Sequence, residues 1–423
     1  MRGYNSLFNS SRRAILPITL LLILVTLVPL SNLRKNLLFL SGSRELDPLG
    51  QSHKSSFTLQ HSHIIPDESI RLIRGCNQFR GKWVPYPPGP QYTNRSGCLI
   101  EDGQNCMKFG RPDTEFMYWR WKPHDCELPI FDAARFLHLV KGKSMAFVGD
   151  SLARNHMQSL GCLLSSVARP VDVSHTNNRL FKRWVYPTHN FTLKLLQTTH
   201  LVKAHGVDPH SLEPIDLYLD EADEFWGAQV EDMDYVIIST GHWFSRPLIY
   251  HEKGKVVGCH MCNRNNLSDM TRFYGHRKAL QTAFSKLLDL PSFEGTVVMR
   301  TISPTHFEAE ERKGNGNCVR ERPYNKEEVK LDWYVSMFYM DQMEEHWAAE
   351  KEGRERGIKF RLLDITETMR MRPDGHPNHY GHLPNVKKLS ADCLHWCMPG
   401  PVDVWNELLL QLLEREESEG KAF

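Results

Sequence analysis

Short apolar runs alternate with longer amphipathic segments from about residue 140 to residue 414. The short runs are rich in apolar and β-branched residues, which is typical of buried strands, and the longer segments repeat apolar residues at helical spacing. The predicted strands are 144–148, 235–240, 296–300 and 359–363, and the predicted helices are 152–164, 269–288, a long one within 326–356, and 402–414. This alternation predicts an α/β fold, in which active sites lie at the edge where the strands end.

The stretch at 14–30 carries no charge. As a helix it would span about 25 Å, enough for a thin bilayer, and the arginines before it favour a cytosolic N-terminus and a lumenal body. We therefore expect a membrane anchor. A cleaved signal peptide is the alternative, because Pro17 and Pro29 interrupt the run. Either segment would export the rest of the chain.

The composition around this stretch predicts how the chain is divided. Residues 1–13 would be a cytosolic tail, 14–30 the signal anchor, and the polar segment 31–70 a flexible stem. A Cys- and Trp-rich lobe follows at 71–132, and the alternating strands and helices at 133–423 would form a large α/β domain.

Charge argues against one class of partner. The 423 residues include 52 Lys and Arg against 50 Asp and Glu, and 41% are hydrophobic. A net charge of +2 does not suit a protein that grips nucleic-acid phosphates, so we expect no nucleic-acid partner and a neutral or weakly charged ligand.

The cysteines indicate an oxidising compartment. There are ten, all downstream of the apolar stretch, and three glycosylation sequons at Asn94, Asn190 and Asn266 agree with a lumenal location. We expect disulfides; for the pair at 259 and 262, a short bridge or two separate bridges is preferred over a metal or redox centre. The candidates are Cys76, Cys98, Cys106, Cys126, Cys162, Cys259, Cys262, Cys318, Cys393 and Cys397.

A Gly-Asp-Ser turn follows the first predicted strand and opens the first predicted helix. Gly149 and Asp150 would form the turn and expose the hydroxyl of Ser151 at the sheet edge. The helix that begins there directs backbone N–H groups and its positive dipole end at any anion formed near that hydroxyl. Ser151 is therefore a candidate nucleophile, although Asp and Ser are also common helix caps.

A candidate base lies near the C-terminus. Asp392 and His395 are three residues apart, so both side chains can face the same way, and Asp392 could hold one imidazole nitrogen while the other takes the proton of Ser151. Cys393 and Cys397 would fix this loop. The alternative is a zinc site made by these two cysteines and His395, which would need a further ligand; we expect no metal.

Aromatic residues are candidates for the substrate site. Gly241, His242 and Trp243 follow the strand at 235–240, so they would lie at the same edge as Ser151 and could line the site or help to stabilise an oxyanion, with core packing as the alternative. The candidates for stacking on sugar rings, again with packing as the alternative, are Trp119, Trp121, Trp243 and Trp396.

At several long motifs the chain resembles the plant trichome-birefringence-like family, whose members are cell-wall polysaccharide O-acetyltransferases related to the Gly-Asp-Ser-Leu esterases. The resemblance covers about residues 75–415. It rests on 76–84, 105–113, 118–129, the 149–151 turn with Arg154 and Asn155, 300–307 and 392–397.

The resemblance implies a triad of Ser151, His395 and Asp392 on a three-layer α/β/α fold with a mainly parallel sheet, similar to the SGNH esterases. It also implies a lobe tied to this body by Cys76, Cys98, Cys106 and Cys126, through partners that include 162 and 397, and a single-pass type II protein of the Golgi membrane. Residues 149, 150, 154, 155 and 241–243 would support the site.

The segments 372–377 and 399–406 are most similar to the xyloglucan-acetylating branch, which acts on side-chain galactose. The hypothesis is a double displacement through an acetyl-serine, with a polysaccharide acceptor and an acetyl donor such as acetyl-CoA, and with no bound cofactor. The alternatives are a mannan or glucomannan O-acetyltransferase, a polysaccharide acetylesterase, and a non-catalytic wall-polysaccharide binding protein.

Overall fold

A computed structural model describes residues 76–176, 178, 180–308, 317–329, 332–383 and 391–420. The predicted tail at 1–13, the anchor at 14–30 and the stem at 31–70 lie outside the described residues. Among the helices that the structure does describe, none combines the length and the apolar character needed to cross a bilayer.

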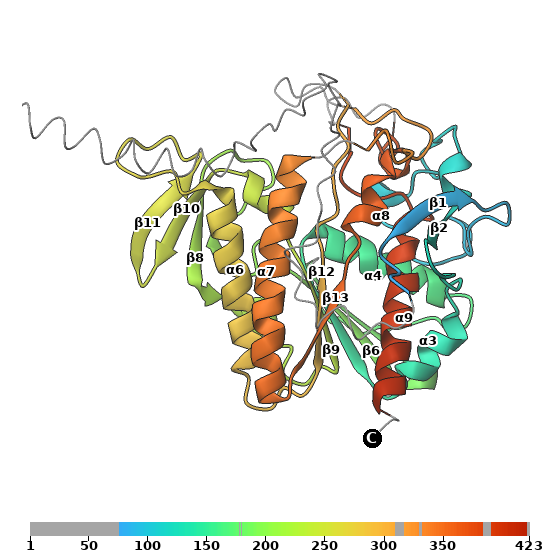
Figure 1. Cartoon of the computed structure of the whole chain (residues 1–423), viewed down its shortest axis with the longest axis horizontal. Coiled ribbons are helices and arrows are strands. Elements are labelled where there is room, and N and C mark those ends of the chain that lie inside the picture. Colours follow the sequence, from blue (N-terminus) through green and yellow to red (C-terminus); the bar gives the residue numbers. More distant parts are fainter. Residues whose placement is uncertain are drawn as a thin grey trace, which may run out of the picture. The chain divides into compact units, whose positions relative to one another are not determined.

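A seven-stranded sheet forms the centre of the described catalytic region (Figure 1). Its strand order is β13-β12-β9-β3-β6-β5-β4. The strands from β13 to β6 run parallel, and β5 and β4 continue the sheet in antiparallel pairing. The bounds are β3 Ser144–Gly149, β4 Val171–Asp172, β5 Phe181–Tyr186, β6 Phe191–Gln197, β9 Tyr235–Ser239, β12 Thr296–Arg300 and β13 Lys359–Leu363.

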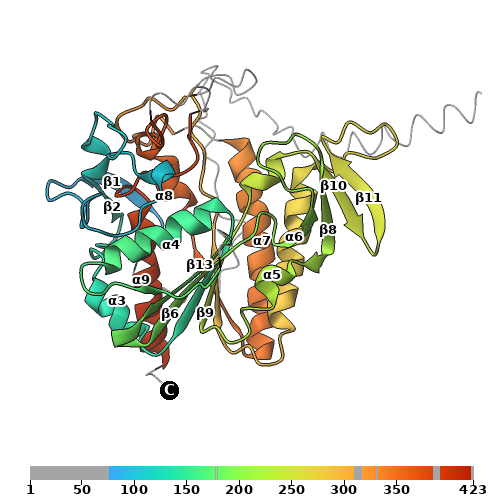
Figure 2. The same cartoon turned by 180° about the vertical axis from the view of Figure 1, so that it is seen from behind.

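Helices cover both faces of this sheet (Figures 1 and 2). Successive residues of a strand point to opposite faces. In β3, Met145 and Phe147 accordingly pack with α3, α4 and α9, whereas Ala146 and Val148 pack with α5, α6 and α7. The predicted three-layer arrangement with a mainly parallel sheet is therefore confirmed. The helices are α3 Ala133–Leu139, α4 Ser151–Leu164, α5 Glu224–Gly227, α6 Thr271–Leu288, α7 Trp333–Arg356 and α9 Asp403–Gly420.

A second sheet was not predicted. It has the order β11-β10-β8-β7 and packs against α6, with Leu217, Tyr250, Ala279 and Phe338 in one apolar cluster. Its strands are half-buried and carry many polar residues, which hides them in the sequence. The bounds are β7 Val202–His205, β8 Ile215–Ala222, β10 Leu248–Glu252 and β11 Lys255–His260.

The N-terminal lobe contains an antiparallel pair, β1 Gly81–Pro85 with β2 Trp119–Pro123, and β1 contacts α8 Thr366–Arg370. Two disulfides, Cys98–Cys162 and Cys106–Cys397, tie the lobe to the body. Cys76 and Cys126 pair with each other within the lobe. The expectation that all four lobe cysteines reach the body is therefore wrong for this pair.

The remaining cysteines also pair. Cys259 bonds Cys262, so the short bridge is the arrangement present, and Cys318 bonds Cys393. All ten cysteines belong to the described residues, and none of them is free.

Candidate active site

The turn between β3 and α4 is formed by residues that tolerate it. Gly149 has a φ of +152°, and a Cβ at this position would lie 2.0 Å from the backbone oxygen of Ser239, so a side chain cannot be accommodated. Asp150 caps α4, because its carboxylate accepts a hydrogen bond of 2.9 Å from the N–H of Leu152. Ser151 is thereby fixed as the first residue of α4, at the carboxyl end of β3.

The C-terminal loop brings its histidine to this serine. Nε2 of His395 lies 2.7 Å from Oγ of Ser151, and Nδ1 of His395 lies 2.7 Å from Oδ2 of Asp392. The carboxylate can only accept, so Nδ1 carries the proton and Nε2 of the neutral ring accepts from the hydroxyl. Residues 244 positions apart in the sequence thus form one continuous hydrogen-bonded chain.

The charges within this chain favour a base. Burial by itself lowers the pKa of His395, but the charge of Asp392 and its hydrogen bond outweigh burial and hold that pKa above its usual value. For Asp392, burial raises the pKa, while His395 and the backbone N–H groups of Leu394 and His395 more than offset this and lower it to about 2. The carboxylate is therefore ionised at neutral pH and stabilises an imidazolium beside it.

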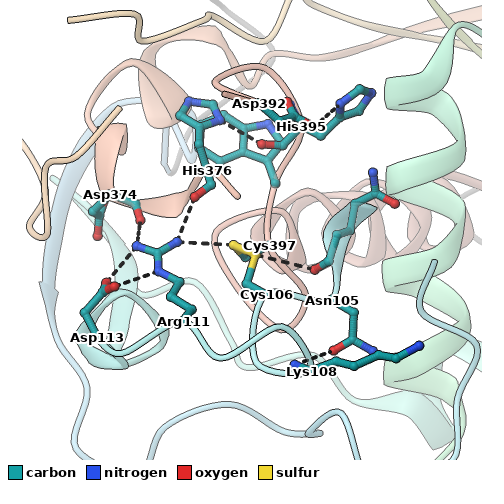
Figure 3. The surroundings of a disulfide bond; sticks show 12 residues. Asn105, Cys106, Lys108, Arg111, Asp113, Asp374, His376, Asp392, His395 and Cys397 are labelled. Carbon is teal, nitrogen blue, oxygen red and sulfur yellow. Dashed lines mark hydrogen bonds and ion pairs between the residues drawn. A yellow bond between two sulfur atoms is a disulfide. The ribbon is translucent and has the colours of Figure 1, made fainter. Parts of the chain in front are cut away.

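The loop that carries His395 is held from several directions. Asn155, on the turn of α4 after Ser151, accepts from the N–H of Trp396 at 2.8 Å and donates to its carbonyl at 3.3 Å. Cys397 is bonded to Cys106 of the lobe (Figure 3). The same helix therefore positions both the serine and the histidine, which gives a nucleophile and its base the precision that proton transfer requires.

Comparison with known proteins agrees with this geometry. Residues 128–412 match PC-Esterase, described as the GDSL/SGNH-like acyl-esterase family found in Pmr5 and Cas1p, and residues 74–127 match the PMR5 N-terminal domain. The chain belongs to the PC-esterase family. The two matched regions meet at 127/128.

Similar proteins are found among plants. Protein trichome birefringence-like 19 of Arabidopsis thaliana is 45% identical, over 99% of this chain and 97% of the relative. Xyloglucan O-acetyltransferase 4 of Populus trichocarpa is 42% identical over 85% and 86% of the two chains, and Xyloglucan O-acetyltransferase 1 of Arabidopsis thaliana is 37% identical over 86% and 85%. The family predicted from the motifs is confirmed.

His242 of this PC-esterase lies beside the site but does not match the oxyanion role suggested for it. Its Nε2 lies 2.7 Å from the carbonyl oxygen of Ser303, which only accepts, so the proton is on Nε2. Burial lowers the pKa of His242, so the ring is neutral and Nδ1 has no hydrogen to donate. Neighbouring Gly241 has a φ of +152° and allows the chain to turn after β9, and Trp243 is partly exposed.

Arg154 lies at the rim of the site. Its Nη1 donates to Oε1 of Gln197 at 2.9 Å and its Nε lies 3.0 Å from Oε2 of Glu101. Arg154 therefore joins α4 to the end of β6 and to the lobe, and no hydrogen bond connects it to the three residues of the Ser151 chain among the contacts described.

Two of the tryptophans proposed to stack on sugar are core residues. Trp121 and Trp396 are fully buried, and their indole N–H groups donate to the carbonyl of Gln78 and to Oγ of Ser303. A sugar ring cannot reach them, so both take the core-packing role that was the alternative to stacking.

Other predicted positions have these surroundings. Cys393 and Cys397 are bonded to Cys318 and Cys106, so the alternative zinc site with His395 is excluded. The sequon residues are exposed on the surface, where a glycan could attach, and their modification stays a prediction; they are Asn94, Asn190 and Asn266.

Sequence reasoning missed the residues that hold the histidine loop from behind. Arg111, His306 and His376 were noticed only as parts of motifs, and no role was assigned to them. Arg111 and His376 are almost fully buried, although arginine is usually found at the surface. Only the folded chain brings their contacts together.

Proposed function

We propose that this PC-esterase is an O-acetyltransferase that uses Ser151 as its nucleophile and acts on hydroxyl groups of a plant cell-wall polysaccharide. The observation that carries the proposal is the hydrogen-bonded chain from Ser151 through His395 to Asp392, with both contacts at 2.7 Å. The two xyloglucan O-acetyltransferases among the relatives favour transfer to a sugar over hydrolysis.

In the first half of the reaction, Nε2 of His395 takes the proton of Ser151 as Oγ attacks the acetyl carbonyl carbon of the donor. Asp392 stabilises the imidazolium that forms. The tetrahedral intermediate then collapses, the bond to the donor breaks, and His395 returns the proton to the leaving group. The enzyme is left with an acetyl ester on Ser151.

In the second half, a sugar hydroxyl takes the place of the leaving group. His395 removes its proton, the hydroxyl oxygen attacks the acetyl-serine carbonyl, and the collapse of the second intermediate frees Ser151 with the proton returned to it by His395. The acetyl group ends on the sugar, so neither half of the proposed reaction uses a redox partner or a bound cofactor.

We infer that the acceptor is xyloglucan, at galactosyl side chains, with mannan as the second candidate, and that acetyl-CoA is a candidate donor. The relatives named for xyloglucan support the acceptor. Anchoring in the Golgi membrane by residues 14–30, with a lumenal catalytic domain, completes the proposal. A fluorescent fusion tests it: we expect colocalisation with a Golgi marker, and a diffuse cytosolic signal would contradict it.

The decisive experiment incubates the purified protein with an acetyl donor and unacetylated xyloglucan, mannan and xylan oligosaccharides, and follows the products by mass spectrometry. We expect acetylated xyloglucan. Release of free acetate without acetylated sugar would establish an acetylesterase. Acetylation of mannan alone would identify mannan, and not xyloglucan, as the acceptor. An unchanged product yield in Ser151→Ala would contradict the proposed nucleophile.

A further inference from the structure

Arg111 of the N-terminal lobe is almost fully buried behind the loop that carries His395. A guanidinium has five N–H donors, and each of them finds an acceptor here. Nε and Nη2 donate to the carboxylate of Asp113 at 2.8 and 2.7 Å, and Nη2 also donates to the carbonyl of Asp374 at 2.6 Å. Nη1 donates to the carbonyl of His376 at 2.8 Å and to Sγ of Cys397 at 3.2 Å (Figure 3).

Asp113 belongs to the lobe, and the other acceptors lie on two segments of the catalytic domain. One contains Asp374 and His376, and the other contains Cys397, two residues after His395. The ring of Phe116, also from the lobe, covers the guanidinium, with its centroid 4.0 Å from Cζ of Arg111. Arg111 therefore fixes the distance between the two segments from the side of the lobe.

His376 continues the contact to the catalytic histidine. Its Nδ1 lies 2.7 Å from the carbonyl oxygen of His395, its ring stacks on Trp396 with centroids 4.1 Å apart, and its Nε2 lies 2.7 Å from Nδ1 of His306. Nε2 of His306 in turn lies 3.0 Å from the carbonyl oxygen of Arg370.

The number of ring hydrogens on His306 and His376 limits which of these three contacts can be hydrogen bonds. Carbonyl oxygens end the chain on both sides, so three hydrogens would be needed for three contacts, whereas two neutral imidazoles supply two. Burial lowers the pKa of His306 to about 4 and that of His376 well below its usual value, so both rings are neutral at pH 7. The carbonyl oxygen of His395 only accepts, and Nδ1 of His376 lies 2.7 Å from it, so His376 donates from Nδ1 to the carbonyl of His395.

We propose that Arg111 and His376 are positioning residues for His395, so that the N-terminal lobe helps to set the geometry of the active site. Arg111 fixes the backbone at His376, and the His376 ring then fixes the backbone of His395. This inference rests on the proposed acetyl-serine chemistry and extends it to residues that do not touch the substrate.

The first test measures the burst of p-nitrophenolate that the full-length protein releases from p-nitrophenyl acetate, which reports formation of the acetyl-serine. His376→Asn and His376→Gln are a matched pair. The Asn amide lies where Nδ1 lies and can still donate to the carbonyl of His395, whereas the Gln amide reaches toward His306 instead.

We expect His376→Gln to slow the burst about 10- to 100-fold, with KM unchanged, because small misplacements of a reacting group cost that much. His376→Asn should recover most of the rate although it loses the contact with His306 and the stacking on Trp396. Melting temperatures show whether the two variants fold equally. Equal burst rates in the two variants, whether both slow or both normal, would overturn the role of His376.

Arg111→Lys tests the lobe, because a lysine cannot make the forked set of contacts. The control is Arg372→Lys. Arg372 is also buried and makes a forked pair with Asp374 at 2.8 and 2.9 Å. It donates to the lobe at the carbonyl of Phe116, but its described hydrogen bonds do not reach His376 or Cys397.

Both arginine variants should lower the melting temperature, but only Arg111→Lys should slow the burst about tenfold or more at a temperature where both are folded. Equal burst rates for the two variants would overturn the proposal. The outcome is separable from the proposed function itself, since that fails if Ser151→Ala retains the burst, whatever the other variants do.

Discussion

The Cys106–Cys397 disulfide joins the lobe to the residue two positions after His395, and its removal should cost more stability than removal of any short bridge. Its sequence separation is 291 residues, against 3 for Cys259–Cys262. With the Cys98–Cys162 and Cys318–Cys393 bridges intact, the loop it closes in the unfolded chain is still roughly 170 residues.

Chain entropy gives the magnitude. Opening a loop of that size costs about 5 kcal/mol, whereas opening the Cys259–Cys262 loop costs less than about 2 kcal/mol. All four cysteines are buried, so replacing each pair by alanine removes comparable apolar contacts, and the Cys397 variant also loses the hydrogen bond that Arg111 donates to its sulfur. We expect the Cys106→Ala/Cys397→Ala variant to lose about 3 kcal/mol more than the Cys259→Ala/Cys262→Ala variant.

Urea unfolding of the oxidised proteins, followed by tryptophan fluorescence, measures both free energies of unfolding. The p-nitrophenyl acetate burst of the folded variants gives the rate at which Ser151 is acetylated. The variant without Cys106 and Cys397 should also react more slowly, because its catalytic loop has lost one of its attachments, while the control keeps the normal rate. Equal losses of stability in the two variants, or an unchanged burst in both, would refute the reasoning.

Other variants test the site from different sides. The pKa of His395 is raised and the base must be neutral, so the wild-type burst rate should increase with pH through a midpoint above 6.5. Asp392→Asn removes the carboxylate that raises this pKa, so the midpoint of its pH–rate profile should fall and its burst rate should drop about 10³- to 10⁴-fold. Asn155→Ala loses both hydrogen bonds to the backbone of Trp396 and should slow the burst about tenfold. The control Asn406→Ala removes an equally buried amide, which donates to Ser159, and should lower only the melting temperature. Comparable burst rates in the two variants would argue against a role of Asn155 in holding the histidine loop. Gly149→Ala should yield little folded protein, because its Cβ meets a backbone oxygen at 2.0 Å; a normal yield and melting temperature would show that the turn is not as tight as described.

The central strands could be predicted from the sequence because they are buried on both faces. The edge strand β13 coincides with the predicted 359–363 although it is only partly buried. Of the central strands, β12 coincides with the predicted run at 296–300, and β3 begins at the predicted residue 144. Such continuous apolar runs have few other interpretations. The helix expected within 326–356 begins only at Trp333, where Asp332 caps it through the N–H groups of Tyr334 and Val335.

The second sheet could not be predicted in this way. The strand β8 alternates buried and partly exposed residues, and β11 is mostly exposed at its start, so neither has the apolar run that identified β3. The turn between β10 and β11 has only two residues, whereas β8 pairs with β10 across the 25 residues that separate them in the sequence, and no local pattern indicates that pairing.

The three triad residues could be named from the sequence because each stands in a local pattern that chemistry explains: a strand-turn-helix for Ser151, and a short spacing for Asp392 and His395. The residues behind them have no such pattern. Arg111 acts through its distance to His376 and Cys397, which are 265 and 286 positions away, and folding alone creates that proximity.

The most direct test of the account follows one acetyl group through the enzyme. The protein is treated with an isotopically labelled acetyl donor, the acetylated peptide is identified by mass spectrometry, and unlabelled xyloglucan oligosaccharide is then added. We predict that the label is found on Ser151, leaves it when the oligosaccharide is added, and appears on the sugar at the same rate. Label that stays on Ser151 while the sugar becomes acetylated, or sugar acetylated as fast by Ser151→Ala, would contradict the account.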